Sequence, residues 1–206
     1  LVPALAAVAV LGASGCNMFL MATYLIKGNN VPPECTCLKD KRVVVVCRPV
    51  VSLHYANARV EQDLAQQIAG LLRKNVPKIK VVDQRKAAEW MDQNQWEDYV
   101  EVGKALHAEL VLGVDLEQFS ILQGQTLYQG RAVTHVKVYD CKTGELVFSK
   151  RPAPSVYPPN RPVPTSEKQE SEFRREFIRV LADQIGRNFY EHDAYADIAL
   201  DAKSME

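Results

Sequence analysis

Apolar residues divide the chain into an uncharged amino end and a patterned body. The first 26 residues contain no Asp, Glu, Lys or Arg, and positions 1–11 are almost wholly aliphatic. The body opens at residues 43–46 with four consecutive valines. β-Branched side chains favour an extended backbone, and a strand that is apolar at every position suits burial on both faces. This run therefore predicts a strand covered on two sides, which ends at Pro49.

Three helices are predicted between residues 57 and 106. Asn57 is suited to cap the first helix, which ends near Asn75 and is closed by Pro77. Its apolar positions recur at helical spacing: Val60, Leu64, Ile68, Leu71 and Leu72. A short strand at 79–82 comes next, and Asp83 then caps the second helix. That helix turns three residues to the core: Ala87, Ala88 and Met91. The third helix is marked by Trp96, Tyr99, Val100, Gly103 and Leu106.

An antiparallel meander is predicted for residues 109–148. Residues 109–119 form a strand with 110–114 as its buried part, and a polar turn follows at 123–125. Residues 127–139 alternate with the period of a strand that has one wet face. Its drier face carries Ala132, Thr134, Val136 and Val138, and its wetter face Arg131, Val133, His135 and Lys137. A turn at 140–145, in which Gly144 accepts a positive φ, leads to the returning strand 146–148.

Residues 152–164 contain six prolines, so this segment predicts neither helix nor central strand but an extended surface connection. Ser166 and Gln169 then have the spacing of a capping box. The last helix turns six apolar residues inward: Phe173, Phe177, Val180, Leu181, Ile185 and Phe189. The predicted order is β-α-β-α-α-β-β-β-α. It indicates one α/β (α+β) domain over 42–192, a three-layer-like mixed sheet with helices packed on it, and a flexible tail over 193–206.

The amino end has the pattern of an exported lipoprotein. An apolar run followed by small residues up to Cys16 is typical of a secretory signal peptide, here residues 1–15. It resembles the lipobox of bacterial lipoprotein signals, although Ala13 stands where Leu is usual. By that resemblance Cys16 is the lipidated residue, carrying acyl chains such as palmitate, and 16–41 is a linker. Asn17 is not the Asp that retains lipoproteins at the inner membrane, which favours the outer membrane. Because the apolar stretch continues to Ile26, a single-pass membrane anchor remains the alternative.

The body resembles a domain shared by the curli-secretion lipoprotein family, the lipoprotein activators of penicillin-binding proteins and the amino-terminal domain of TolB. The matching parts are the opening strand 43–47 and the helix after it, the helix-to-strand step 102–113 and the hairpin 136–147. The resemblance covers roughly 42–190 and implies an envelope protein that binds other proteins and is not an enzyme. The turns at 123–125 and 141–144 are too short for the inserted hairpins of the curli pore, which argues against a channel.

Composition narrows the chemistry further. Twenty-five basic and twenty-five acidic residues give no net charge, so the composition lacks the excess of positive charge that is typical of nucleic-acid-binding domains. Four cysteines besides Cys16 permit three pairings in an oxidising compartment, and free thiols remain the alternative: Cys35, Cys37, Cys47 and Cys141. The lone Cys35–Thr36–Cys37 motif is too little for a zinc site, so we expect no metal and no cofactor.

Few residues offer catalysis. His135 is a possible general base, and Asp115 and Glu117 a possible carboxylate pair, but polar residues on a wet strand are the simpler interpretation. The candidate partner-binding strip is Tyr157, Pro158 and Pro159, a stiff segment with one aromatic anchor. The sequence therefore favours a membrane-tethered, non-catalytic lipoprotein that binds or scaffolds an envelope protein or its own copies. The alternatives are a periplasmic hydrolase acting on cell-wall material and a subunit of a secretion or motility assembly.

Overall fold

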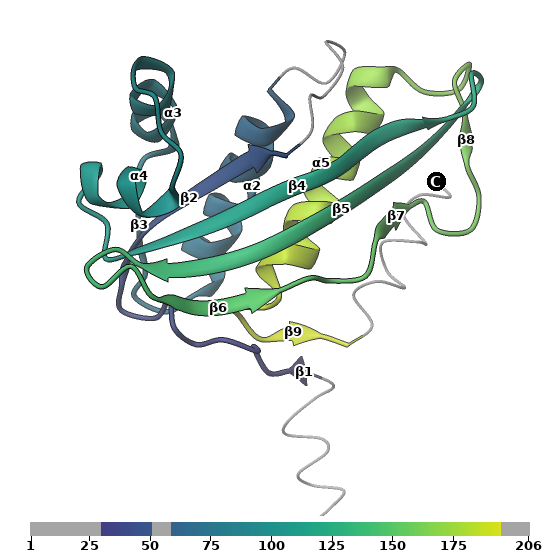
Figure 1. Ribbon diagram of the computed structural model, residues 1–206. Helices are drawn as coiled ribbons and strands as arrows, with labels where there is room; N and C mark the ends of the chain where they lie inside the picture. Colours follow the sequence, from purple (N-terminus) through teal and green to yellow (C-terminus); the bar gives the residue numbers. More distant parts are fainter. Residues whose placement is uncertain (1–29, 51–58, 195–206) are drawn as a thin grey trace, which may run out of the picture.

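The computed structural model describes residues 30–50 and 59–194, which are built around one mixed sheet (Figure 1). The central strands follow the order β3-β2-β4-β5-β6. Their bounds are β2 Arg42–Pro49, β3 Lys80–Val81, β4 Leu110–Gln123, β5 Leu127–Asp140 and β6 Leu146–Lys150. β2 runs parallel to both β3 and β4, whereas β4, β5 and β6 pair antiparallel. The sheet is therefore parallel at one edge and a meander at the other.

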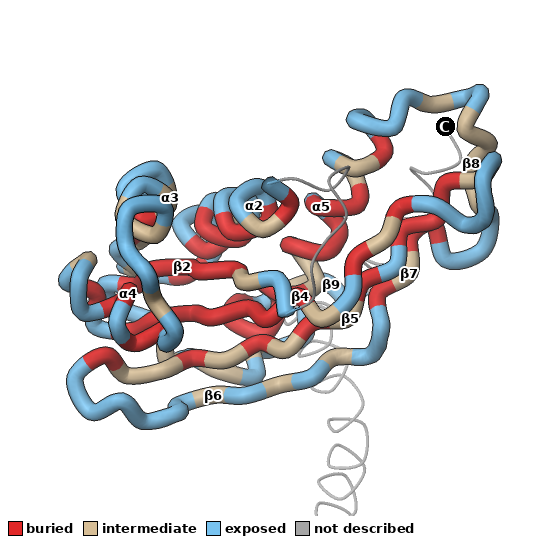
Figure 2. The backbone as a smooth tube through the Cα atoms, turned by 45° about the horizontal axis from the view of Figure 1, so that its top comes forward, coloured by how far each residue is buried: buried red, intermediate tan, exposed pale blue. Residues whose placement is uncertain are grey.

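Helices cover both faces of the sheet (Figure 2). Their bounds are α2 Val60–Asn75, α3 Gln84–Gln93, α4 Tyr99–Ala105 and α5 Glu170–Gly186. Val43 and Val45 join the larger core cluster, which contains α2 and α5. Val44 and Val46 join a separate cluster with residues of α3 and α4. The prediction of a two-sided strand and a three-layer α/β arrangement is thus confirmed.

The long β4–β5 hairpin follows the predicted alternation. Ala132, Thr134, Val136 and Val138 are buried, and their neighbours on the other face are partly or fully exposed. In the turn after β5, the carboxylate of Asp140 accepts hydrogen bonds from the backbone N–H groups of Lys142 and Thr143. Gly144 has φ 79°, as the turn requires. β4 is longer than predicted because it continues past Phe119 to Gln123, through an irregularity in the ladder between Ser120 and Leu122.

The proline-rich segment forms two short edge strands. β7 (Ser155–Tyr157) and β8 (Val163–Pro164) pair with the first half of β5, beyond the end of β6. The segment is neither a helix nor a central strand, as predicted. It is nevertheless part of the sheet and not a connection lying on the surface.

The described part of the predicted linker packs against the domain. β1 (Asn30–Val31) pairs with β9 (His192–Asp193), and the backbone N–H of Cys35 donates to the carbonyl of Asn188 over 3.0 Å. Leu38 is fully buried in the larger core cluster. Residues 30–41, which the sequence placed in a linker outside the domain, therefore pack against it, and Leu38 belongs to its core.

Helix starts follow the sequence signals unevenly. The side chain of Asp83 caps α3 by accepting from the N–H of Arg85, as predicted. The capping box at Ser166 was wrong, because α5 begins only at Glu170 and Gln169 makes no side-chain cap. Residues 164–167 are instead held in a turn, in which the N–H of Glu167 donates to the carbonyl of Pro164. Asn57 lies outside the described residues, and α2 begins after Arg59.

No helix among the described residues has both the length and the apolar character needed to cross a bilayer. The predicted alternative membrane anchor, residues 1–26, lies outside them.

Replacing Leu38 by Ala tests the packing of the predicted linker. Loss of a fully buried leucine removes burial energy and leaves a cavity, so we expect the free energy of unfolding to fall by about 2–5 kcal/mol. Urea denaturation followed by circular dichroism measures it. The neighbouring exposed residue supplies the control, since Lys39→Ala should change stability by no more than about 0.5 kcal/mol. Equal stability of the two variants would mean that this segment is a linker and does not contribute to the core.

Candidate functional site

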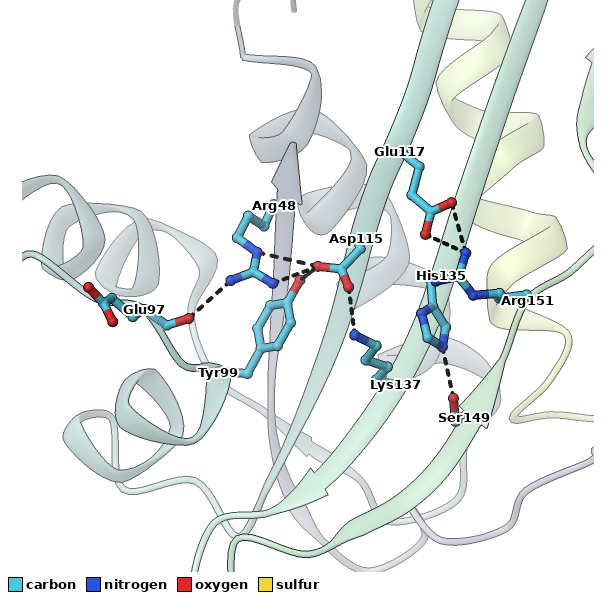
Figure 3. Close-up of polar contacts among 9 residues, drawn as sticks. All are labelled: Arg48, Glu97, Tyr99, Asp115, Glu117, His135, Lys137, Ser149 and Arg151. Carbon is cyan, nitrogen blue, oxygen red and sulfur yellow. Dashed lines mark hydrogen bonds and ion pairs between the residues drawn. The ribbon is translucent and has the colours of Figure 1, made fainter. Parts of the chain in front are cut away.

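A buried carboxylate organises the polar side of the sheet (Figure 3). Asp115 of β4 faces Arg48 of β2, Lys137 of β5 and Tyr99 of α4, and we call these four residues the Asp115 cluster. Oδ1 of Asp115 accepts from the Tyr99 hydroxyl at 2.7 Å and from Nη2 of Arg48 at 3.0 Å. Oδ2 accepts from Nζ of Lys137 at 2.8 Å. One acid thereby joins three strands and a helix.

The charge state of the Asp115 cluster follows from these contacts. Asp115 is only 5% exposed, and burial by itself would raise the pKa of its carboxyl group. The hydrogen bonds from Lys137, Tyr99 and Arg48 outweigh burial and hold that pKa below its ordinary value. Burial and the hydrogen bond to Asp115 raise the pKa of Tyr99. The cluster is therefore an ionised acid with a neutral phenol and two cations, which is the arrangement of a structural cross-link.

Arg48 extends the cluster toward the loop before α4. Its guanidinium group lies over the Tyr99 ring, 4.9 Å from the centroid. Nη1 donates to the carbonyl oxygen of Glu97 at 3.0 Å. The next residue, Asp98, caps α4 by accepting from the N–H of Val100. Because these contacts fix the start of α4, they fix the position from which Tyr99 reaches Asp115.

Beyond the end of α4, the same face of the sheet carries paired polar side chains. Arg151 binds Glu117 with its Nη1 atom 2.7 Å and 3.0 Å from the two carboxylate oxygens. Nε2 of His135 lies 2.8 Å from the hydroxyl oxygen of Ser149. Burial and the nearby charges of Lys137 and Arg151 lower the pKa of His135. The two acids singled out in the sequence thus each have their own cation, and do not form a pair that shares a proton.

Two grooves open on the surface, at opposite sides of the sheet. The first, about 700 Å³, lies along β2 between α2 and α3, and we call it the β2-edge groove. The second, about 630 Å³, lies between residues 31–34, the proline-rich segment and α5, and we call it the proline groove. Asp115, His135 and Ser149 line neither groove. The possible acid–base residues therefore lie outside both grooves.

The structure separates the members of the predicted partner-binding strip. Tyr157 is buried, and the centroid of its ring lies 6.0 Å from the ring centroid of Phe173 and 6.5 Å from that of Phe177. Pro158 is buried, and its carbonyl oxygen accepts from the Gln129 side chain at 3.1 Å. Pro159 is exposed and lines the proline groove. Tyr157 and Pro158 therefore fasten the strip to its own domain, and of the three residues Pro159 faces outward. Cys16 lies outside the described residues.

The other four cysteines form one disulfide and two buried thiols. Cys35 and Cys37 form a disulfide, whereas Cys47 and Cys141 are buried thiols. Burial raises the pKa of Cys141 to about 11, so this thiol is unreactive near neutral pH. Within residues 30–50 and 59–194, no group of three or more His, Cys, Asp or Glu side chains could hold a metal ion.

The sequence alone did not reveal the Asp115 cluster. Arg48 looked like the end of an apolar strand, Lys137 like a solvated residue, and Tyr99 like a core position of a helix. One signal was present: Asp115 follows five apolar or small residues in a strand predicted to be buried, and a buried acid requires cationic partners. Which cations supply the pairing depends on the register of β2, β4 and β5, which the sequence does not fix.

No protein-family model and no curated protein matches the chain. Among solved structures it is similar to the PelC dodecamer protein of Paraburkholderia phytofirmans, with 14% identity over 78% of this chain and 96% of that one, at a TM-score of 0.47. It is similar to the lipoprotein GNA1162 of Neisseria meningitidis, with 11% identity over 70% and 96% of the chains, at 0.42. It is also similar to the LpoB C-terminal domain of Salmonella enterica, with 13% identity over 68% of this chain and 93% of that one, at a TM-score of 0.36.

Several of the similar structures are named as lipoproteins, including a minor lipoprotein of Acinetobacter baumannii. The fold class rests on the strand order and the two helical layers of this chain itself.

Replacing Asp115 by Asn tests the cluster. The amide leaves Lys137 and Arg48 without a counter-charge, so we expect the free energy of unfolding at pH 7 to fall by about 2–4 kcal/mol. This loss is smaller than for a fully buried ion pair, because water partly solvates both cations. The folded-state pKa of Asp115 lies below the unfolded value, so its contribution is complete above the unfolded pKa and disappears as the pH falls through the folded one. The difference from wild type should therefore shrink in acid.

Urea denaturation at neutral and acidic pH measures this difference. Asp92→Asn, at an exposed position, is the control and should differ little from wild type at any pH. A difference for Asp115→Asn that is the same at all pH values would mean that the ionised carboxylate is not what stabilises the fold.

Proposed function

We propose that this protein is a non-catalytic lipoprotein of the cell envelope, tethered to a membrane through Cys16, whose domain binds another envelope protein. The observation that carries the proposal is the proline groove, a hollow of about 630 Å³ bordered by a rigid proline strip and by the chain that leads to the tether. The outer membrane, facing the periplasm, is the proposed location because Asn17 follows the cysteine.

The strip that borders the groove is held in place by its own domain. Tyr157 is fixed against two phenylalanines of α5, and the hydroxyl of Ser155 donates to the side-chain oxygen of Gln184 on the same helix, at 2.6 Å. β7 pairs with β5. A surface that is already ordered loses little conformational entropy when a partner binds. Pro154 and Pro159 remain exposed on it and supply apolar contact.

The position of the groove relative to the tether suits a partner at the same membrane. Val31, Pro32 and Glu34 form one wall, and these residues follow directly on the amino-terminal segment. The chain from Cys16 to Asn30 reaches at most ~50 Å when fully extended. A partner in the groove would therefore lie within that distance of the lipid surface.

The state of the polar residues supports a role without catalysis. A general base needs an available lone pair and a substrate position beside it. The carboxylate of Asp115 already accepts from three donors, and Glu117 is bound by Arg151. His135 and Ser149 are close enough to act together, but they lie on an open strand face outside both grooves. Binding accounts for this arrangement better than hydrolysis does.

Lipid labelling tests the tether. Cells producing the full chain are given an alkyne analogue of palmitate, and the purified protein is probed for the label. We expect the wild-type protein to be labelled and Cys16→Ser to lose the label, because a lipoprotein is acylated at its first mature residue. Cys141→Ser, which alters a buried thiol, should be labelled like wild type. Equal labelling of wild type and Cys16→Ser, or none in either, would contradict the lipid anchor.

Site-specific crosslinking in the producing cells tests the binding surface. A benzophenone amino acid is placed at Pro159, in the proline groove, and in a second variant at Lys142, in the exposed turn after β5. We expect one defined protein adduct from position 159 that is absent from position 142. The adduct should weaken when Cys16→Ser is added, because the tether brings the partners together. Identical adducts from both positions, or none from position 159, would count against this surface.

A further inference from the structure

β6 leaves one edge of the sheet open. It is the last strand on the meander side, and among the described residues no strand other than β5 pairs with it. Figure 2 shows it at the rim of the sheet, with most of its length exposed. Leu146 is 51% and Val147 is 47% exposed, although both side chains are large and apolar. An exposed strand with unpaired main-chain groups is a template for pairing with another chain.

The hydrogen bonds at the end of β5 show which way each of its residues faces. The N–H of Cys141 donates to the carbonyl of Glu109, next to β4, over 2.9 Å. The N–H of Asp140 donates in the opposite direction, to the carbonyl of Glu145, next to β6, also over 2.9 Å. Pairing with β4 is regular over this part of β5. Because alternate residues of a strand face the same edge, the even-numbered residues from 136 to 140 face β6.

This alternation identifies the main-chain groups at the open edge. Phe148 and Lys150 lie opposite Val138 and Val136, and all four direct their N–H and C=O groups into the ladder between β5 and β6. Ser149 lies between them and therefore directs its N–H and C=O groups away from β5. No hydrogen-bond partner for these two groups occurs in the part of the chain that the structure describes.

β6 is held firmly against its own domain. The ring of Phe148 packs edge-on against that of Phe189, with 5.4 Å between the ring centroids. Nζ of Lys150 donates to the side-chain oxygen of Asn188 at 2.9 Å and forms an ion pair with Glu34. An edge that is ordered beforehand loses little conformational entropy when a partner binds.

The charges at the ends of β6 select a second copy of the same strand as that partner. Glu145 precedes the strand, and Lys150 and Arg151 stand at its other end. Antiparallel pairing of two copies brings each acidic end toward the basic end of the other, whereas parallel pairing brings like charges together. Arg151 binds Glu117, but its side chain is 62% exposed and can also contact an acid on a second copy. The strand is therefore self-complementary about a two-fold axis.

We propose that β6 pairs antiparallel with β6 of a second copy of this chain, centred on Ser149, so that two sheets join into one. In this pairing the N–H of each Ser149 donates to the carbonyl of the other. Val147 lies opposite Arg151 of the second copy, whose aliphatic stem covers the exposed valine. Glu145 lies diagonally across from the same arginine.

The pairing is weak in solution and depends on the tether. β6 has an extra residue at Val147 relative to β5, so the regular edge is short. A contact of this length covers less than the roughly 800 Å² per partner that stable complexes bury. A membrane anchor holds copies close together and raises their effective concentration. The inference therefore rests on the proposed tether for the place where dimers form.

Cysteine crosslinking of the full chain tests the pairing. Ser149→Cys and, as a control, Lys142→Cys in the exposed turn before β6 are produced in cells. The cells are treated with a short, membrane-permeable bismaleimide, and dimers are measured by electrophoresis under reducing conditions. Position 149 meets its own copy in the proposed pairing, whereas position 142 lies far from the axis on each chain. We expect dimers from Ser149→Cys and only background from Lys142→Cys.

Charge reversal in the Ser149→Cys background tests the direction of the strands. We expect Glu145→Arg alone and Arg151→Glu alone each to lower the dimer yield about fivefold, because like charges then meet twice across the two-fold axis. Combining the two substitutions exchanges the acidic and basic ends and should restore the yield. Glu145 is exposed, so its variant folds, and circular dichroism of each purified variant checks this.

Three results would overturn the pairing. They are equal dimer yields from positions 149 and 142, yields that the single charge reversals leave unchanged, and no recovery in the double variant. Adding Cys16→Ser separates this inference from the proposed function. Dimers that fall to background with Cys16→Ser support a pairing that needs the tether. Dimers that form although Cys16 carries no lipid label would refute the tether and leave the pairing standing.

Discussion

Burial of β2 on both faces is the constraint on which the architecture depends. Four successive valines send apolar side chains to opposite sides of the sheet, and each side must be closed to water. α2 and α5 close one side and α3 and α4 the other, which places β2 in the interior and makes its neighbour β4 equally apolar at the paired positions. The crossover through α2 and the longer connection through α3 and α4 both follow, because parallel strands require helices or loops to return the chain.

The Asp115 cluster stands where this two-sided burial ends. α4 is only seven residues long and covers the first part of β4, up to Gly113, whose position leaves no space for a side chain beneath the Tyr99 ring. Two residues further along β4, on the same face of the sheet, the apolar layer ends and the next side chain is that of Asp115. An acid at this boundary is stabilised by a phenol from the helix and by cations from the strands on either side. The cluster thus binds the short helical layer to the sheet at the point where apolar contacts become insufficient.

The elements with strong periodicity could be predicted from the sequence, and those defined by long-range packing could not. The valine run, the alternation over β5 and the apolar stripe of α5 each carry their signal within a few residues, and all three predictions are confirmed. Leu38 looked like one apolar residue in a polar linker, because the pocket that receives it is formed by distant parts of the chain. Ser166 had the spacing of a cap, but pairing of β8 with β5 holds the preceding residues in a turn. Tyr157 was correctly singled out as an aromatic anchor, yet what it anchors is its own strand, since α5 presents Phe173 and Phe177 to it.

The two edges of the sheet are protected in different ways, and the difference bears on binding. Along β5 the edge is divided among β6, β7 and β8, and the prolines between them have no N–H groups to offer another strand. β6 is the last strand of the described sheet on that side, and its five residues include no proline. Along β2 the edge beyond β3 is covered, because Val45 is fully buried and Cys47 is only 5% exposed. The two grooves lie at opposite edges of the sheet and share no lining residue, so occupation of one would leave the other free.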